Sequence, residues 1–355
     1  MAWLVRVVHT ETGRREGILP IENPPWARKL NQSGTGQASF VVGDVDSSGM
    51  PGRYLSEPIL RTLVFEESGV PVFAGVIWKR VYDREAGKVT VTYTDINSIF
   101  GKRMCAAYSS AGMQGTTVGW SNLDLQTQLK RVIQQATTGT KFALPITFPA
   151  DKSGSASREY KGYHMPIAAD AMRDLINTQY GPDVDFIPEY AANGELRHRL
   201  VTTPAPTLLV WNLTAPKDGA IGLTVTEDAA NVANHIIATG EGTEADMLVR
   251  SAISGASLYP ALVKTVAFSE EKDAAILQAL ANAELAASLK PVEQWSFSVI
   301  IGEDYKLSQL YPGAGVRAYM QDDPWMNDGF YHLRLIGFSG DFGAKVKLEF
   351  QPMEA

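Results

Sequence analysis

The sequence predicts an α+β chain that is mostly β, with two β-barrel domains, an α+β insert and a helical excursion. Short runs near both ends of the chain alternate apolar and polar residues with a period of two, which is typical of half-buried strands. These runs follow the same order at the two ends: strand, long connection, strand, hairpin, strand, turn, strand. Helical spacing replaces the alternation between them. The sequence therefore predicts two similar β-modules separated by other material.

Residues 1–100 are predicted to form the first β-barrel domain. The alternating runs are Ser39–Val42, Ile59–Phe65, Val72–Trp78 and Lys88–Thr94. Glu66–Gly69 lies between two of these runs and predicts a hairpin loop, because glycine adopts the backbone angles of a tight turn. Short strands at such spacing favour a small closed or nearly closed barrel.

Residues 101–199 are predicted to form an α+β insert domain. Ser121–Asp124 supplies an N-cap, and apolar side chains then recur at helical spacing up to Ala136. A second helix is predicted from Pro166, ending before Tyr180–Pro182. Asn193-Gly194 separates two further alternating runs and predicts a hairpin.

The second β-barrel domain is predicted to be discontinuous, with residues 200–245 and 292–355 separated by a helical excursion over 246–291. The first part includes a short helix at Glu227–Asn234 that leads into a strand at His235–Thr239. In the excursion, Ser269–Glu271 caps a helix from about 270 to 290. The C-terminal runs that repeat the opening pattern are Trp295–Ile301, Pro312–Tyr319, Phe330–Phe338 and Lys345–Phe350.

Composition narrows the possible functions. A chain of 355 residues exceeds the usual size of a single core, so two or more domains are expected. The formal net charge of -7 argues against tight nucleic-acid binding but suits a conduit past which DNA slides. No apolar run is long enough to insert in a membrane. Met1–Val8 indicates a strand and not a signal peptide, so synthesis in the host cytoplasm is expected.

No pattern of nucleophiles, metal ligands or phosphate loops predicts an enzyme. The single cysteine, Cys105, is expected to be a small apolar core residue. Thr138–Phe142 and Gly34–Gln37 lack the spacing of a phosphate-binding loop and predict turns. Ser153–Ser157 predicts a flexible surface loop, because no nucleophile elbow is present. The five histidines lack metal-ligand spacing; they are His9, His164, His198, His235 and His332.

The acidic pairs and the tryptophans also predict structural roles. Three acidic pairs lie beside glycine or proline and are expected to be solvated turn acids: Asp183 with Asp185, Glu303 with Asp304, and Asp322 with Asp323. Four tryptophans could form a sugar-stacking platform, but their spacing favours core or subunit-interface packing; they are Trp78, Trp211, Trp295 and Trp325. No catalytic, cofactor-binding or metal-binding residue is predicted, and no cofactor.

Several segments carry a resemblance to a known family. Leu30–Val42 followed by Val72–Ile77 resembles the first domain of phage tail hub proteins. Three further parts of the chain are similar to the same family in long-tailed phages of actinobacteria: Ala171–Ile176 with Gly181–Phe186, Gly194–Leu196, and Glu227–Asn234 with Gly240–Gly242. The chain thus resembles the baseplate hub and minor tail protein family, similar to the central hub of contractile phage baseplates.

The resemblance implies a structural virion protein. Hub proteins of this kind carry two tail-tube-like barrel domains, and three copies form a homotrimeric ring with pseudo-sixfold symmetry at the distal tail tip. The ring would join the tail tube to the tip complex and gate DNA passage. Implied partners are the hexamer of the distal tail or tail-tube protein, the tape-measure protein, other tail-tip proteins or fibres, and transiently passing DNA.

Two alternatives of other classes remain open from sequence: a host cell-wall hydrolase that would use Asp183 or Asp185, and a carbohydrate-binding adhesin of the tail tip. The spike base of a contractile secretion apparatus is a variant of the hub hypothesis. Many relatives continue into fibre or wall-degrading domains. Because this chain stops after the second module, host recognition and hydrolysis are expected on other proteins.

Overall fold

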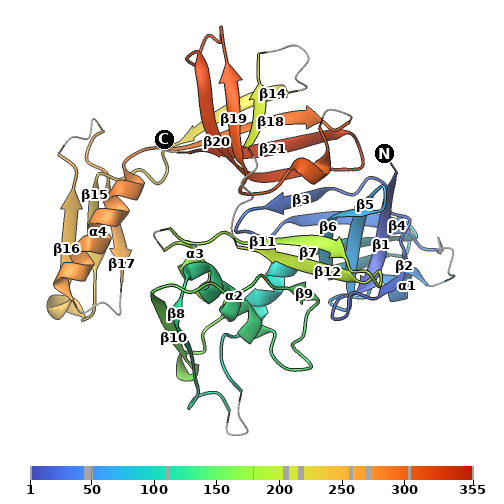
Figure 1. The fold of residues 1–355 in the computed structure, drawn as a ribbon, viewed down its shortest axis with the longest axis horizontal. Helices are drawn as coiled ribbons and strands as arrows, with labels where there is room; N and C mark the ends of the chain where they lie inside the picture. Colours follow the sequence, from blue (N-terminus) through green and yellow to red (C-terminus); the bar gives the residue numbers. More distant parts are fainter. Residues whose placement is uncertain are drawn as a thin grey trace. The chain divides into compact units, whose positions relative to one another are not determined.

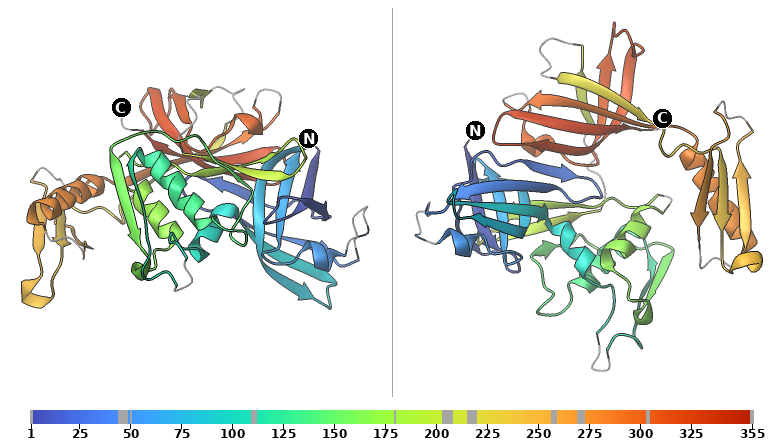
Figure 2. Two further views of the ribbon diagram at one scale, coloured as in Figure 1. Left: turned by 60° about the horizontal axis from the view of Figure 1, so that its bottom comes forward. Right: turned by 180° about the vertical axis from the view of Figure 1, so that it is seen from behind.

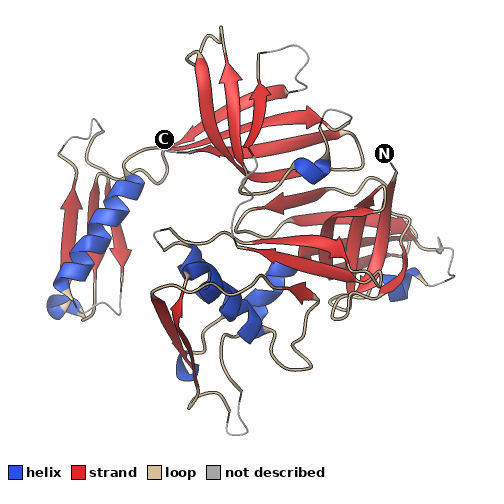
Figure 3. Ribbon diagram, viewed as in Figure 1, coloured by secondary structure: helices blue, strands red, loops and turns tan. Residues whose placement is uncertain are grey.

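The computed structural model divides into two compact units, Met1–Leu223 with Ser296–Ala355, and Thr224–Trp295 (Figure 1). The structure describes residues 2–43, 49, 51–108, 112–178, 180–202, 208–214, 220–255, 259–268, 273–302 and 305–353. Strands outnumber helices in both the N- and C-terminal parts, as Figure 3 shows. The predicted α+β, mostly β class is confirmed.

Six strands form the first sheet, in the spatial order β2-β1-β5-β6-β7-β4, with all neighbours antiparallel. The elements of this region are β1 (Trp3–His9), β2 (Arg15–Ile18), β3 (Trp26–Lys29), β4 (Thr35–Val41), α1 (Gly52–Leu55), β5 (Arg61–Glu67), β6 (Val70–Asp83) and β7 (Lys88–Asp95). The predicted hairpin between β5 and β6 is confirmed: Ser68 and Gly69 have φ angles of 52° and 84°, the pair of positive values that a tight primed turn needs.

The insert combines helices with short strands. Its elements are η1 (Ile96–Lys102), β8 (Thr117–Leu123), α2 (Leu125–Ala136), β9 (Ile146–Thr147), β10 (Ala156–Lys161), η2 (Gly162–His164), α3 (Ala168–Ile176), β11 (Asp185–Tyr190) and β12 (Leu196–Val201). Asp124 caps α2 by accepting a hydrogen bond of 2.7 Å from the Thr127 backbone N–H. Both predicted helices and the Asn193-Gly194 hairpin are confirmed.

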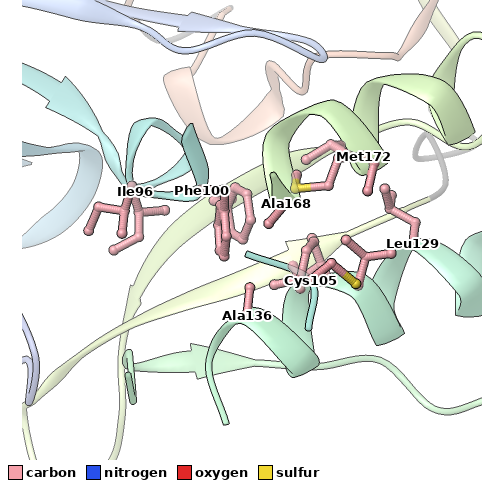
Figure 4. Close-up of a cluster of buried hydrophobic side chains, with 14 of the residues drawn as sticks. Ile96, Phe100, Cys105, Leu129, Ala136, Ala168 and Met172 are labelled. Atoms are coloured by element: carbon pink, nitrogen blue, oxygen red, sulfur yellow. The ribbon is translucent and has the colours of Figure 1, made fainter. Parts of the chain in front are cut away.

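The helices of the insert form a core that also includes Val76 of β6. Leu129 and Ala136 of α2 pack with Ala168 and Met172 of α3 and with Phe100 of η1 (Figure 4). Phe100 stacks on Phe186 of β11, with ring centroids 5.7 Å apart. This core fixes β11, which begins at Asp185 and follows Asp183, two acidic residues considered below.

The second sheet has the order β13-β19-β20-β21-β18-β14, and β3 from the N-terminal region pairs with β20. Its elements are β13 (Leu208–Asn212), β14 (Ile221–Asp228), β18 (Val292–Ile300), η4 (Leu307–Gln309), β19 (Gly315–Met320), β20 (Gly329–Gly340) and β21 (Lys345–Pro352). In the described residues, the strand pairing of each sheet is an open path, and neither sheet is a closed barrel.

The two sheets repeat the order of four strands, β5-β6-β7-β4 in the first and β19-β20-β21-β18 in the second. The central strands carry a bulge at corresponding places, after Ile77 in β6 and after Leu335 in β20. Ile77 pairs with Tyr93, and Leu335 pairs with Phe350. All four side chains are buried. The repetition predicted from sequence is therefore present in strand order and register.

The unit Thr224–Trp295 contains a three-stranded sheet, β16-β15-β17, and one long helix. Its elements are β15 (His235–Thr239), η3 (Glu244–Asp246), β16 (Val249–Ile253), β17 (Val263–Ala267) and α4 (Ala274–Ser288). Leu277 and Ala281 of α4 pack on Ile236 and Ala238 of β15, which buries one face of the sheet.

Two expectations for this part of the chain are wrong. Glu227–Asn234 is not a helix, because Glu227 and Asp228 end β14 and a turn follows. His235–Thr239 pairs with β16 and β17, and not with the second large sheet. The segment predicted as a helical excursion over 246–291 is thus an α+β unit that begins earlier in the chain. The predicted Ser269–Glu271 cap lies outside the described residues. None of the described helices is long and apolar enough to cross a membrane.

Candidate functional site

The candidate site is a junction where residues 30–36 contact three parts of the same compact unit. This loop connects β3, which pairs with β20 of the second sheet, to β4, which pairs with β7 of the first. The backbone N–H of Leu30 donates to Ile336 O of β20 at 2.8 Å. The backbone N–H of Asn31 donates to Val184 O of the insert at 3.1 Å. One short loop therefore joins both sheets and the insert.

The side chain of Asn31 fixes the loop to the insert. Its Oδ1 accepts a 2.7 Å hydrogen bond from the backbone N–H of Val184, and its Nδ2 donates to Asp183 Oδ1 at 3.3 Å. Asn31 has a φ of 59°, a left-handed conformation that asparagine tolerates better than most residues. The backbone angle and the two hydrogen bonds together favour asparagine at position 31.

Two arginine–aspartate pairs hold the insert to the second sheet. Arg28 of β3 donates to Asp185 of β11, and Arg334 of β20 donates to Asp183. The Arg28 and Asp185 side chains are 11% and 10% exposed, so the partners hold each other's charge in a largely dry setting. Buried pairs of this kind fix geometry, and loss of one partner leaves an uncompensated charge.

Asp95 ties the same loop to the first sheet. Its Oδ2 accepts from the Gly34 backbone N–H at 2.7 Å, and its Oδ1 accepts from the Asn97 N–H at 3.1 Å and caps η1. Burial above all, with a smaller contribution from the charge of Asp185, raises the pKa of Asp95 to about 7, although the hydrogen bonds from Gly34 and Asn97 lower this pKa. Asp95 is therefore the junction residue whose charge changes near neutral pH.

The glycines of the loop allow the close approach. A Cβ on Gly34 would lie 1.9 Å from the Ala27 carbonyl oxygen, and one on Gly36 would lie 2.4 Å from the Tyr93 ring. The Tyr93 hydroxyl donates to Pro25 O at 2.5 Å. The expected turn at Gly34–Gln37 is wrong, because Thr35–Gln37 already belong to β4 and pair with β7. The two glycines serve close packing.

The acidic pairs do not behave alike. Asp183 and Asp185 are buried and paired with arginines, so their assignment as solvated turn acids is wrong; two arginines distant in sequence supply the missing counter-charge. Both carboxylates are engaged in ion pairs, which gives no support to their use as a hydrolytic acid and base. Asp322 and Asp323 do lie in an exposed turn, where Asp323 accepts from the Trp325 N–H at 2.9 Å. Glu303 and Asp304 lie outside the described residues.

The remaining sequence candidates are dispersed. Cys105 is buried in the insert core, and burial raises the pKa of its thiol to about 12, as a structural cysteine requires. His198 is buried in β12, where burial lowers its pKa to about 4. The other histidines lie on separate elements: His9 on β1, His164 on η2, His235 on β15 and His332 on β20. The described residues contain no cluster of three potential metal ligands.

The turn and tryptophan predictions have mixed outcomes. Thr138–Phe142 forms a turn after α2, as expected, with the Phe142 N–H donating to Gly139 O at 3.0 Å. Ser153–Ser157 is not simply a loop, because β10 begins at Ala156. Trp211 and Trp295 are buried and Trp78 is half-buried, which agrees with packing, whereas Trp325 is 81% exposed. The four do not lie in one element pair that would suit a sugar platform.

Sequence reasoning missed Arg28, Arg334 and Asp95 as site residues. Each is an isolated charged residue in or beside a strand, and its partner lies 157, 151 or 61 positions away in sequence. The one available signal was the glycine pair in the loop, because glycines that precede a strand indicate close backbone approach.

Comparison with known proteins places this fold. A search of protein-family models gives no match, and no curated protein matches the sequence. A tail protein from Neisseria meningitidis superposes with a TM-score of 0.59 at 14% identity, over 99% of this chain and 97% of that one. A 43 kDa tail protein of prophage MuSo2 from Shewanella oneidensis gives a TM-score of 0.57 at 11% identity, over 98% of each chain.

A component of the E. coli type VI secretion system shares the fold too, with a TM-score of 0.51 at 10% identity, over 99% of this chain and 77% of that one. Because these identities are low, the similarity defines the fold. The chain has the fold of phage tail proteins, which this secretion protein also has.

Proposed function

We propose that the chain is a structural protein of a phage tail baseplate, in which three copies form a ring of six similar domains at the distal end of the tail. The observation that carries this proposal is the repeated strand order, β5-β6-β7-β4 and β19-β20-β21-β18, within one chain of tail-protein fold. Two similar modules per chain let three chains present six matching faces to a hexameric tube.

In this proposal each sheet belongs to one tail-tube-like barrel module, and the insert and the unit Thr224–Trp295 keep threefold symmetry. The ring joins the tail tube, or the distal tail protein, to the tip proteins and fibres, and the tape-measure protein and then DNA pass through it. The net charge of -7 suits passage of DNA without tight binding. The junction residues hold the two modules of one chain together, which a ring under load requires.

A label on this chain tests the proposed role. We expect gold-conjugated antibody against the chain to mark the distal end of the tail in negatively stained particles. Label along the tail tube, on the capsid, or absent from particles would contradict the assignment. The fold suits a contractile secretion apparatus as well as a phage tail. If the same antibody labels such an apparatus, the chain belongs there and not to a phage tail.

A further inference from the structure

We propose that the outer edge of β6, residues Lys79–Asp83, binds a strand from a second copy of this chain, in the position that β3 holds on β20. The inference rests on the proposed ring and identifies a surface through which its subunits join. A comparison of the two sheets position by position supports it, because the edge that β3 covers on β20 has no strand beside it on β6 in the part of the chain that the structure describes.

The bulges define which residues correspond. After the bulge in β6, Lys79 pairs with Thr92 of β7; after the bulge in β20, Gly337 pairs with Glu349 of β21. Lys79 therefore corresponds to Gly337, and the following residues correspond in turn up to Tyr82 and Gly340. Two backbone hydrogen bonds support this correspondence. Val42, which follows β4, donates to Gly87 O just before β7 at 2.7 Å, and Ile301, which follows β18, donates to Ala344 O just before β21 at 2.8 Å.

On β20, the segment Gly337–Gly340 pairs with a strand on each side. One side faces β21, and the other faces β3 in antiparallel register, from Gly337 opposite Lys29 to Gly340 opposite Trp26. Trp26 is only 1% exposed, donates from Nε1 to Asp341 O at 3.0 Å, and packs edge-on against Phe338. The added strand is thus an integral part of the second sheet, although it comes from the N-terminal region.

On β6, one side of the same segment is paired. Lys79–Asp83 faces β7, but the pairing of β6 with β5 ends at Val76, and the Ile59 N–H bonds Ile77 O at 2.7 Å. Beyond that point, the described residues provide no strand along the outer edge. The β6–β7 hairpin, blue to cyan in the left view of Figure 2, extends past the rest of its sheet.

Exposed apolar side chains gather at this end of the sheet. Val81 is 47% and Tyr82 58% exposed, and the neighbouring Val41 and Val42 are 52% and 48% exposed. Tyr82 and Val42 line an open groove of about 560 Å³ together with Phe40, Arg80, Val89 and the segment from Pro51 to Arg53. An unpaired edge beside apolar surface is the usual template for strand addition, in which main-chain hydrogen bonds supply affinity.

A second copy is the occupant that the repetition favours. Within one chain, a strand leaving the first module covers the edge of the second. In a closed ring, the second module of each chain faces the first module of the next chain. The corresponding edge, Lys79–Asp83, therefore faces the neighbouring copy, and the contact is heterologous and closes with the ring.

The test uses the full chain with substitutions on one strand. Along Lys79–Asp83 the backbone groups of alternate residues face β7, which leaves the N–H groups of Arg80 and Tyr82 directed at the outer edge. Tyr82→Pro removes one of these N–H groups and obstructs an approaching strand, and Tyr82→Lys leaves the backbone intact while placing a charge on the apolar edge. Val70→Lys is the control, because Val70 is 57% exposed and lies on the same strand. Sedimentation would give the association constant, and hydrogen exchange would give the protection of the Arg80 and Tyr82 amides in dilute and concentrated protein.

We expect wild type and Val70→Lys to associate alike, and both Tyr82 variants to associate about tenfold or more weakly. The Arg80 and Tyr82 amides of wild type should gain protection only on association. Tyr82 variants that associate normally would overturn the edge contact and leave the ring standing. Protection of these two amides already present in dilute monomer would mean that the chain covers its own edge, which also overturns the contact. A wild type that never associates would contradict the proposed ring itself.

Discussion

The first and second sheets have the same four-strand connectivity but differ at their edges. In the second, β3 pairs with the outer side of β20; in the first, the corresponding part of β6 pairs with β7 but has no strand on its outer side among the described residues. Strand order follows from the hairpins and the alternation within each module, whereas the strand at the edge of β20 comes from a distant part of the chain. Two modules with the same strand order can therefore differ at their edges.

A second difference lies at the end of the last shared strand. The register places Asp95 of β7 in the position of Pro352 of β21, because these residues face Gly75 and Leu333 at corresponding points. Asp95 accepts backbone hydrogen bonds from Gly34 and Asn97, which holds the 30–36 loop. Only the first sheet therefore has a titratable anchor at this point.

The largest expected effect comes from breaking the ion pair between the insert and the second sheet. Arg28→Met leaves Asp185 without its partner in a largely dry setting, and we expect a loss of about 3–5 kcal/mol in the free energy of unfolding. Urea unfolding followed by tryptophan fluorescence measures it. In the double variant Arg28→Met/Asp185→Leu, most of the loss should be recovered. If the single variant costs under about 1 kcal/mol, the pair does not hold the junction.

The next effect depends on pH. Asp95 has a pKa raised to about 7 in the folded chain, against about 4 when unfolded, so the folded state binds the extra proton between these values. Stability should therefore fall as pH rises from about 4 to about 7, by up to about 4 kcal/mol from this residue. Asp95→Asn should remove that contribution. If the unfolding free energies of wild type and Asp95→Asn depend on pH in the same way, Asp95 does not cause the pH dependence.

A smaller effect should come from the glycine that allows β4 to approach β7. Gly36→Ala places a methyl group 2.4 Å from the Tyr93 ring and 2.6 Å from Pro25 O, and we expect a loss of about 1–3 kcal/mol. Gly101→Ala is the matched control, because a Cβ there meets nothing within 4 Å. Thermal unfolding compares the two. Equal unfolding midpoints for Gly36→Ala and Gly101→Ala would contradict the requirement for glycine at position 36.

The smallest effect distinguishes the two kinds of acidic residue. Asp323→Ala removes a side chain that accepts from the Trp325 and Met326 N–H groups in an exposed turn. We expect a loss of about 0.5–1.5 kcal/mol, well below that of Arg28→Met. Urea unfolding midpoints of Asp323→Ala and Arg28→Met measure the difference. A larger loss of stability in Asp323→Ala would contradict the greater importance of the buried ion pair.

Local signals predicted much of this fold. In β7, the alternation buries Val89, Val91 and Tyr93 and leaves the threonines between them half-buried, so the sequence pattern predicted the strand directly. Ser68-Gly69 and Asn193-Gly194 likewise identified their hairpins. The second β-module was recognisable because β18 to β21 repeat these local signals.

Nonlocal pairing explains what the sequence did not reveal. Residues 229–233 have helix-favouring alanines, but β14 extends through Asp228 and leaves only a turn after it. β3 follows two prolines and is too short to show alternation, so its pairing with β20 was not predictable. The acids Asp183 and Asp185 follow a Gly-Pro turn, which suggested solvation, and only the fold brings Arg28 and Arg334 to them.

The proposed ring requires that three chains present six similar modules. Electron microscopy of the purified full-length chain, averaged along the ring axis, tests it most directly. We expect a closed ring of three chains whose inner wall repeats six times while its outer features repeat three times. A monomer at all concentrations, or a ring whose inner wall repeats only three times, would contradict the equivalence of the two modules.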